Sequence, residues 1–261
     1  MKVGLSISAG KPLVVLAIGS HPDDVELGCG GTLLAHRRRG DQVAMLVMTK
    51  GERGPQGAVS RVDEQVEAAR QFGVHRVFWG GFPDGAVPEG VESIDRIQAV
   101  IDDIHADVVY THSTHDTHQD HRAAAVATVA AARHVSRVLM YEAPSSSRGF
   151  APYFYVDIGP FLARKLEALR AHESQVRKSR LVDLEAVEAQ ARFRGFQSRV
   201  RYAEAFEVER FVWELSGPET QMTPAVQRNG HAHRAASERR SGARSVGADR
   251  TGALSLQERR A

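Results

Sequence analysis

Short apolar runs alternate with longer segments of helical periodicity over most of the chain. The run from 12 to 19 is almost continuously apolar, which is typical of a strand covered on both faces. Glycines at 40 and 73 follow two of the helical segments, where glycine commonly ends a helix. The pattern predicts strands at 12–19, 42–49, 75–79, 107–111, 135–141, 153–158 and 206–213, and helices at 30–39, 60–72, 91–105, 120–133, 161–171 and 181–194.

The order of these elements determines the expected fold class. Single helices separate successive strands, and such β-α-β units pair their strands in parallel through right-handed crossovers. We therefore expect an α/β fold, a three-layer sandwich in which helices cover both faces of a mostly parallel, Rossmann-like sheet. In the commonest strand order of such sheets, the first and fourth strands are neighbours.

Length and composition limit the class of protein. The chain has 261 residues, of which 42% are hydrophobic and 25% charged, as in soluble globular domains. Its longest apolar stretch near the start is far shorter than the roughly 20 residues of a membrane span, so we expect a cytoplasmic protein without membrane contact. The single cysteine, Cys29, excludes an internal disulfide and a cysteine-rich zinc cluster. A bound metal must therefore be held by histidine and aspartate.

Charge is distributed unevenly along the chain. The formal net charge is +2, but residues 217–261 contain eight arginines against four acidic residues and no aromatic side chain. Such a segment buries too little apolar area to offset the entropy of ordering it. We therefore predict one domain over residues 1–216 and a disordered basic tail over 217–261. A solvated extension is the preferred interpretation of this tail, and nucleic-acid binding is the alternative.

A cluster of polar residues follows the first predicted strand. The turn contains His21, Asp23, Asp24 and Glu26. In a parallel sheet this turn lies at the carboxyl edge, where ligands bind. Carboxylates repel phosphate, and the glycines that follow do not form a GxGxxG sequence. The pattern therefore favours a bound cation over a dinucleotide.

A second polar cluster follows the fourth predicted strand, where residues 112–121 contain four histidines and two aspartates. His118 and His121 are three residues apart on the first turn of the predicted helix, so their rings can face one pocket. His112 and His115, taken singly, are interpreted as residues of a solvated loop. If the first and fourth strands are neighbours, the two clusters meet across one crevice.

The two clusters together contain the ligands of a catalytic zinc site, which needs imidazoles, a carboxylate and one position for water. We assign the metal ligands to His21, Asp24 and His121. Asp23 cannot easily point the same way as its neighbour Asp24, so its carboxylate is free to act as a general base. We expect one zinc ion per chain, with other divalent metals as alternatives.

Further residues receive roles at this site. His118 is expected to stabilise an oxyanion or to protonate a leaving amine. Asp120, or alternatively Asp116, is expected to hold the His118 ring by a hydrogen bond. Arg53, on a glycine-rich loop after the second predicted strand, is a candidate for binding a phosphate or carboxylate of the substrate, and an exposed surface arginine is the alternative.

Two motifs in these clusters resemble those of the LmbE-like or PIG-L family of zinc-dependent de-N-acetylases. Weaker similarities at 51–54, 172–175 and 202–206 extend the resemblance over residues 12 to 213. The two motifs are His21-Pro22-Asp23-Asp24, ahead of the glycines, and His118-Gln119-Asp120-His121.

The resemblance implies roles that agree with those assigned above. In this family the matching residues hold zinc, the first aspartate of the first motif is the base, and the first histidine of the second motif stabilises the intermediate. The implied reaction is hydrolysis of an N-acetyl or N-acyl group from a small-molecule amino sugar, such as N-acetylglucosamine, or from its conjugate. Gln119 stands where many members have proline, so the exact substrate is left open.

Two other functions are compatible with these residues. A metal-dependent phosphoesterase would use a similar cluster but prefers two metals and additional carboxylates. A non-enzymatic protein would instead bind its partner through the basic tail. Metal stoichiometry distinguishes the first alternative, and deletion of the tail distinguishes the second. A homo-oligomer is compatible with all of these functions.

Overall fold

One mixed sheet organises the described residues. The computed structural model describes residues 11–54, 60–179 and 182–213. Within these ranges seven strands are joined side by side: β1 (Val14–Gly19), β2 (Gln42–Val47), β3 (Arg76–Trp79), β4 (Val108–His112), β5 (Arg137–Tyr141), β6 (Phe154–Asp157) and β7 (Ala203–Phe211). Their order in the sheet is β3-β2-β1-β4-β5-β7-β6.

Strand pairing confirms the predicted fold class. β1 pairs in parallel with β2 and β4, β2 pairs with β3, and β4 pairs with β5. The neighbouring positions of β1 and β4 agree with the expected strand order. β7 runs antiparallel to β5 and β6, and it begins at Ala203, three residues before its predicted start. Alanine and glutamate have little strand propensity, which explains why the sequence did not reveal this beginning.

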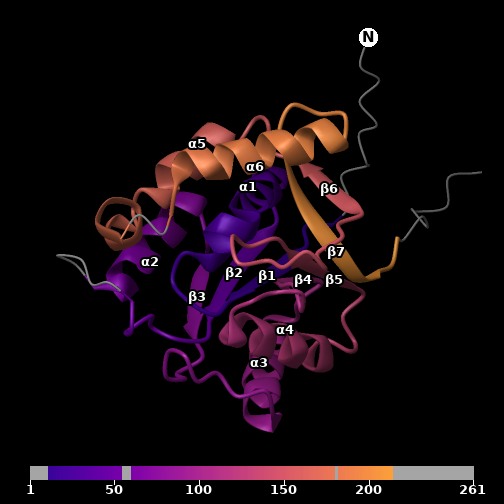
Figure 1. Cartoon of the computed structure of the whole chain (residues 1–261). Helices are drawn as coiled ribbons and strands as arrows, with labels where there is room; N and C mark the ends of the chain where they lie inside the picture. The colour runs from indigo at the N-terminus through magenta and orange to yellow at the C-terminus, as the bar shows by residue number, and fades with distance from the viewer. Residues whose placement is uncertain (1–10, 55–59, 180–181, 214–261) are drawn as a thin grey trace, which may run out of the picture. The chain divides into compact units, whose positions relative to one another are not determined.

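Helices cover both faces of the sheet (Figure 1). The helices are α1 (Asp24–Arg39), α2 (Arg61–Phe72), α3 (Val91–Ile104), α4 (Gln119–Ala131), α5 (Leu162–Leu169) and α6 (Leu184–Gln197). α1, α2, α5 and α6 lie on one face, whereas α3 and α4 lie on the other. A π-helical segment over Ser174–Ser179 follows α5 and was not predicted, because its polar residues carry no helical apolar period.

Alternating side chains of β1 divide the core into two layers. Leu16 and Ile18 pack toward α3 and α4, whereas Val15 and Ala17 pack toward α1. All four side chains are fully buried, which explains the continuous apolar run in this strand. The turn at the carboxyl end of β1 is therefore fixed by a strand that is covered on both faces.

The first helix begins earlier than predicted and contains a kink. It starts at Asp24 rather than at residue 30, and Cys29 interrupts the helical geometry with a φ of −141°. The residues before the kink are mostly polar or glycine, so they carry no apolar period that would reveal a helix. A Cβ added at Gly31 would lie 2.8 Å from the Cγ2 atom of Ile158. The packing after the kink therefore requires glycine at this position.

A buried carboxylate holds the second half of α1. Glu204 of β7 accepts hydrogen bonds from the backbone N–H groups of Gly31 at 2.8 Å and of Thr32 at 2.7 Å. It also accepts a hydrogen bond from Lys165 Nζ of α5 at 2.6 Å, and both of these charged side chains are buried. The carboxylate thus satisfies the free N–H groups that follow the kink.

Replacement of Glu204 by alanine is expected to lower the free energy of unfolding by about 3–5 kcal/mol, because it leaves the Lys165 ammonium buried without its anionic partner. Glu209 lies on the same strand but is exposed. Its replacement by alanine should therefore change stability by no more than about 0.5 kcal/mol. Denaturant titration compares the two variants, and equal midpoints would contradict this account of the kink.

Two predictions fall partly or wholly outside the described residues. The tail predicted at 217–261 lies there, as does the beginning of the helix predicted from 181. Among the helices of the described ranges, none is both long enough and apolar enough to cross a membrane.

Candidate metal centre

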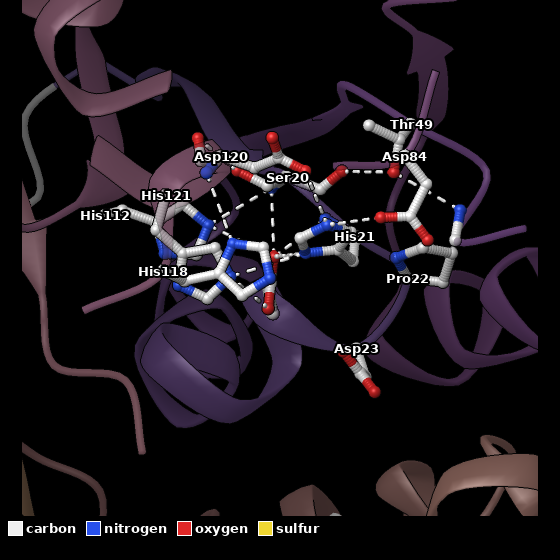
Figure 2. A network of polar contacts seen from close by, with 12 residues as sticks. Ser20, His21, Pro22, Asp23, Thr49, Asp84, His112, His118, Asp120 and His121 are labelled. Atoms are coloured by element: carbon white, nitrogen blue, oxygen red, sulfur yellow. Dashed lines mark hydrogen bonds and ion pairs between the residues drawn. The ribbon is translucent and has the colours of Figure 1, made fainter. Parts of the chain in front are cut away.

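The carboxyl ends of β1 and β4 bring the two polar clusters together. β1 ends at Gly19 and passes into the turn that carries His21, while β4 ends at His112 and leads through a loop into α4. Adjacent parallel strands end at the same edge of a sheet, so residues that follow them meet there. The rings of His21 and His121 lie 5.4 Å apart between centroids, although 100 residues separate them in sequence. Figure 2 shows this cluster from close by.

Three side chains present donor atoms at the spacing of a metal site. His21 Nδ1 lies 3.3 Å from Asp24 Oδ2 and 3.3 Å from His121 Nε2. His121 Nε2 lies 3.5 Å from Asp24 Oδ1. Ligand atoms of a tetrahedral zinc with bonds of about 2.0–2.2 Å are about 3.3–3.6 Å apart. His21 Nδ1 and His121 Nε2 therefore have the spacing of two zinc ligands, and each lies at that spacing from a different oxygen of Asp24.

Three overlapping groups of possible ligands occur among the described residues. In each group, one atom per residue lies within 4.8 Å of the others. His21 and His121 each belong to two groups, so they occupy the centre of the cluster. The groups are His21, His118 and His121; Asp24, His112 and His121; and His21, Asp84 and Asp120.

Each central imidazole has a carboxylate at its outer nitrogen. His21 Nε2 lies 3.1 Å from Asp120 Oδ2 and 3.1 Å from Asp84 Oδ1. His121 Nδ1 lies 3.1 Å from Asp116 Oδ2. This is the usual environment of a metal-binding histidine, because the carboxylate fixes both the ring orientation and the nitrogen that carries the hydrogen. His21 Nδ1 and His121 Nε2 are thereby left facing each other.

The carboxylates around His21 favour the charged form of its ring. Burial opposes a charged imidazole, but hydrogen bonds to Asp120 and Asp24 outweigh it and raise the pKa of His21 to about 10. A positive charge is therefore favoured at this position.

The Asp24 carboxylate is held by backbone and side-chain groups. Its Oδ2 accepts hydrogen bonds from the N–H groups of Ser20 at 3.0 Å and His21 at 2.7 Å. His112 Nε2 lies 3.1 Å from the same oxygen. These contacts orient Asp24 toward the two imidazoles.

The expectation that His112 belongs to a solvated loop is wrong. Its side chain is fully buried, and burial together with the nearby His121 lowers its pKa to about 4. His112 is the last residue of β4, a central strand, and its ring stacks on that of His121 at 3.9 Å between centroids. By contrast, 54% of the His115 side chain is exposed, as expected.

His118 stands at the N-cap of α4, and its ring stacks on that of His121 at 4.5 Å. Its Nδ1 accepts a hydrogen bond from the backbone N–H of Asp120 at 3.2 Å. Burial and the charge of His121 lower its pKa. A neutral ring with Nδ1 as acceptor carries its hydrogen on Nε2, which can donate to a ligand.

Asp120 contacts the His118 ring through its backbone N–H and not through its carboxylate. The Asp120 carboxylate contacts His21 instead. Asp116 accepts a hydrogen bond from the backbone N–H of His118 at 2.8 Å and contacts the ring of His121. The sequence placed these acids in the cluster but could not determine which ring each one contacts, because the contacts join separate loops.

Asp23 lies apart from the imidazoles in Figure 2. Its backbone has a φ of 101°, which is unusual for a residue other than glycine. The backbone N–H donates to Gln65 Oε1 at 3.2 Å, and Oδ2 lies 3.4 Å from Arg61 Nη2. Although Asp23 is at the N-cap of α1, its side chain makes no capping hydrogen bond. Burial and then the neighbouring Asp24 raise its pKa to about 7.

The loop of Arg53 reaches the cluster through a residue that the sequence did not single out. The Arg53 N–H donates to Asp84 Oδ2 at 2.9 Å, and Asp84 Oδ1 is the atom near His21. The side chain of Arg53 lies against Gly85 at the same rim. A usable signal was present, since Asp84 is an acidic residue in the loop that follows the third strand, at the ligand-binding edge.

A protein-family model described as "PIG-L: GlcNAc-PI de-N-acetylase" matches residues 16–132. This range contains both polar clusters of the site. The resemblance noted from the two motifs is therefore confirmed by a match that also covers the strands and helices between them.

Curated and solved proteins resemble the chain over most of the described fold. "Uncharacterized deacetylase YaiS" of Escherichia coli (strain K12) is 36% identical over 176 residues, which are 64% of this chain and 94% of the relative. Diacetylchitobiose deacetylase of Thermococcus kodakarensis is 30% identical over 185 residues, 62% of this chain and 69% of the relative. The crystal structure of a conserved protein from Thermus thermophilus has a TM-score of 0.70 and 32% identity, and the match covers 78% of this chain and 97% of that protein.

Proposed function

Because the chain belongs to the PIG-L (LmbE-like) deacetylase family, we propose that it is a zinc-dependent hydrolase that removes an N-acetyl or other N-acyl group from an amino sugar or an amino-sugar conjugate. The observation that carries this proposal is the spacing of His21 Nδ1 and His121 Nε2, which lie 3.3 Å from each other and 3.3 and 3.5 Å, respectively, from the two oxygens of Asp24. A relative named diacetylchitobiose deacetylase supports an amino sugar as the substrate class.

We assign one zinc ion per chain to these three side chains. When bound, zinc supplies Lewis acidity and lowers the pKa of a water ligand to about 7. The carboxylates at the outer nitrogens of His21 and His121 keep the rings oriented with their inward nitrogens toward the metal position, and binding of zinc would displace any hydrogen from those nitrogens. Asp24 contributes the negative charge that favours a divalent ion over a neutral ligand.

Asp23 is assigned as the general base. It occupies the position of the base in the family motif, and its side chain is not used to cap α1. We assign this carboxylate, which also lies 3.4 Å from Arg61 Nη2, to accept the proton of the water that attacks the amide carbonyl. Asp23 then holds this proton, which the departing amine requires before it can leave as a neutral group.

His118 is assigned as the residue that stabilises the oxyanion of the substrate. Its Nδ1 is engaged by the backbone N–H of Asp120, which leaves Nε2–H as the donor. A donor that is already oriented in the free protein needs no rearrangement when negative charge develops on the carbonyl oxygen. Asp120 acts in the same site by orienting His21.

Arg53 is assigned to substrate binding. The backbone N–H of Arg53 donates to Asp84, which lies beside His21, and Arg53 itself is exposed to solvent. A guanidinium in this position can donate hydrogen bonds to the hydroxyl, carboxylate or phosphate groups of an amino-sugar conjugate.

Acetate release from a panel of N-acetylated amino sugars tests the proposed function. The purified protein is expected to release acetate, to lose this activity when a chelator removes its metal, and to regain it when zinc is added. Inorganic phosphate release from phosphoesters is measured on the same samples. Deacetylation that continues unchanged in metal-free protein, or phosphate release without acetate release, would contradict the proposal.

A further inference from the structure

We propose that Asp84 is a positioning residue that joins the substrate-binding loop to the metal-binding histidine. It would couple the affinity for substrate at Arg53 to the orientation of His21. This inference rests on the proposed function, since it uses the roles assigned there to both residues. The role of Asp84 itself comes from its hydrogen bond with Arg53 and its ion-pair contact with His21.

The two oxygens of one carboxylate contact two different loops. Asp84 Oδ1 lies 3.1 Å from His21 Nε2, the nitrogen that faces away from the proposed zinc position. Asp84 Oδ2 accepts the backbone N–H of Arg53 at 2.9 Å. His21 follows β1 and Arg53 follows β2, so the carboxylate bridges the ends of two neighbouring strands. Figure 2 shows Asp84 beside His21, on the side away from the stacked imidazoles.

The surroundings of Asp84 fix this bridge in place. The Asp84 N–H donates to Glu52 Oε1 at 3.0 Å, which ties it a second time to the loop of Arg53. The next residues are held by Asp120, whose carboxylate accepts the N–H groups of Gly85 at 2.7 Å and Val87 at 3.1 Å. Only 7% of Asp84 is exposed. The bridge is therefore a buried, multiply bonded element rather than a surface contact.

The chemistry of the two partners explains why a carboxylate is needed. The Arg53 N–H requires an acceptor oxygen, and a charged His21 ring is stabilised by a negative oxygen near Nε2. Aspartate offers two such oxygens, whereas asparagine offers one and presents a donor in place of the other. His21 also has Asp120 as an acceptor, so loss of Asp84 weakens but does not remove the support of its ring.

Zinc affinity and steady-state kinetics of Asp84→Ala and Asp84→Asn test the inference. Glu89→Ala is the control, because Glu89 is an exposed acidic residue in the same loop between β3 and α3. Competition against a chromophoric chelator is expected to show zinc binding weakened about 10-fold in Asp84→Ala, the lower end for loss of a residue that orients a metal ligand. KM for the N-acetylated sugar should rise in the same variant. Asp84→Asn keeps one acceptor oxygen, so its zinc affinity and KM should change less than those of Asp84→Ala. Glu89→Ala should match the wild type in both measurements.

A double-mutant cycle with Arg53→Ala tests whether Asp84 acts through Arg53. Arg53→Ala alone should raise KM and leave zinc affinity unchanged. Adding Asp84→Ala to this variant should lower zinc affinity but should not raise KM further, because the group that it positions is absent.

The outcomes separate this inference from the proposed function. Wild-type zinc affinity in folded Asp84→Ala and Asp84→Asn, or KM effects that simply multiply in the double variant, would overturn the positioning role. If the wild type binds two zinc ions per chain and Asp84→Ala binds only one, Asp84 is a metal ligand. This result would also overturn the positioning role. If no sugar is deacetylated, the proposed function fails, and the zinc-affinity measurement still decides whether Asp84 supports His21.

Discussion

Asp23→Asn protein is expected to bind zinc like the wild type and to deacetylate its substrate about 10²–10⁴-fold more slowly, the range that a positioned general base contributes. Asparagine has nearly the same shape, so the hydrogen bond from the backbone of residue 23 to Gln65 can persist. The side chain, however, can no longer accept the proton of the attacking water. The loss should therefore appear in kcat.

The comparison variant for this experiment is Asp95→Asn, which makes the same chemical change at an exposed position of α3. Its kcat should equal that of the wild type. Initial rates of acetate release, together with metal content, are measured for both variants. A kcat for Asp23→Asn within about threefold of the wild type would require another base, since even the weakest such contribution is about 10²-fold.

His121→Ala protein is expected to lose its zinc and its activity together. His121 supplies one of the three assigned ligand atoms, and even a residue that only orients a ligand contributes about 10–100-fold to metal affinity. Removal of the ligand itself should therefore weaken zinc binding by more than about 100-fold. The stabilisation of the fold by added zinc should disappear as well, because that stabilisation requires binding to the native state.

The matched variant is His115→Ala, which removes an imidazole from the same loop but from an exposed position. Metal analysis after dialysis and thermal unfolding with and without zinc compare the two proteins. Full zinc content in His121→Ala, or equal loss of zinc in both variants, would contradict the assignment of His121 as a ligand.

The fold was predictable because its signals are local. The continuous apolar run of β1 reflects burial on both faces, and single helices between strands leave few topologies open. The early start of α1 was not predictable from periodicity, because Asp24 and Glu26 are buried for reasons of the site rather than of the core. These buried acidic residues thus hid the apolar period at the start of α1, where residues of the site are concentrated.

The candidate site was predictable in composition but not in its connections. Spacing along the chain placed His21 and His121 at the ends of two neighbouring strands, where they do meet. It did not reveal Asp84, a single acid whose partners lie on two other loops. It also led to a wrong interpretation of His112, because a histidine at the end of a strand has the same local pattern whether it is buried or exposed. Contacts between loops and the burial of single residues depend on how the loops meet at the edge of the sheet, which local sequence does not show.

The most direct test of the account is an anomalous difference map of crystals of the full chain grown with zinc, recorded at the zinc absorption edge. The account predicts one peak per chain, bonded to His21 Nδ1, an Asp24 oxygen and His121 Nε2 at about 2.0–2.2 Å. A peak held by Asp84 and Asp120 instead, or no peak between His21 and His121, would contradict it.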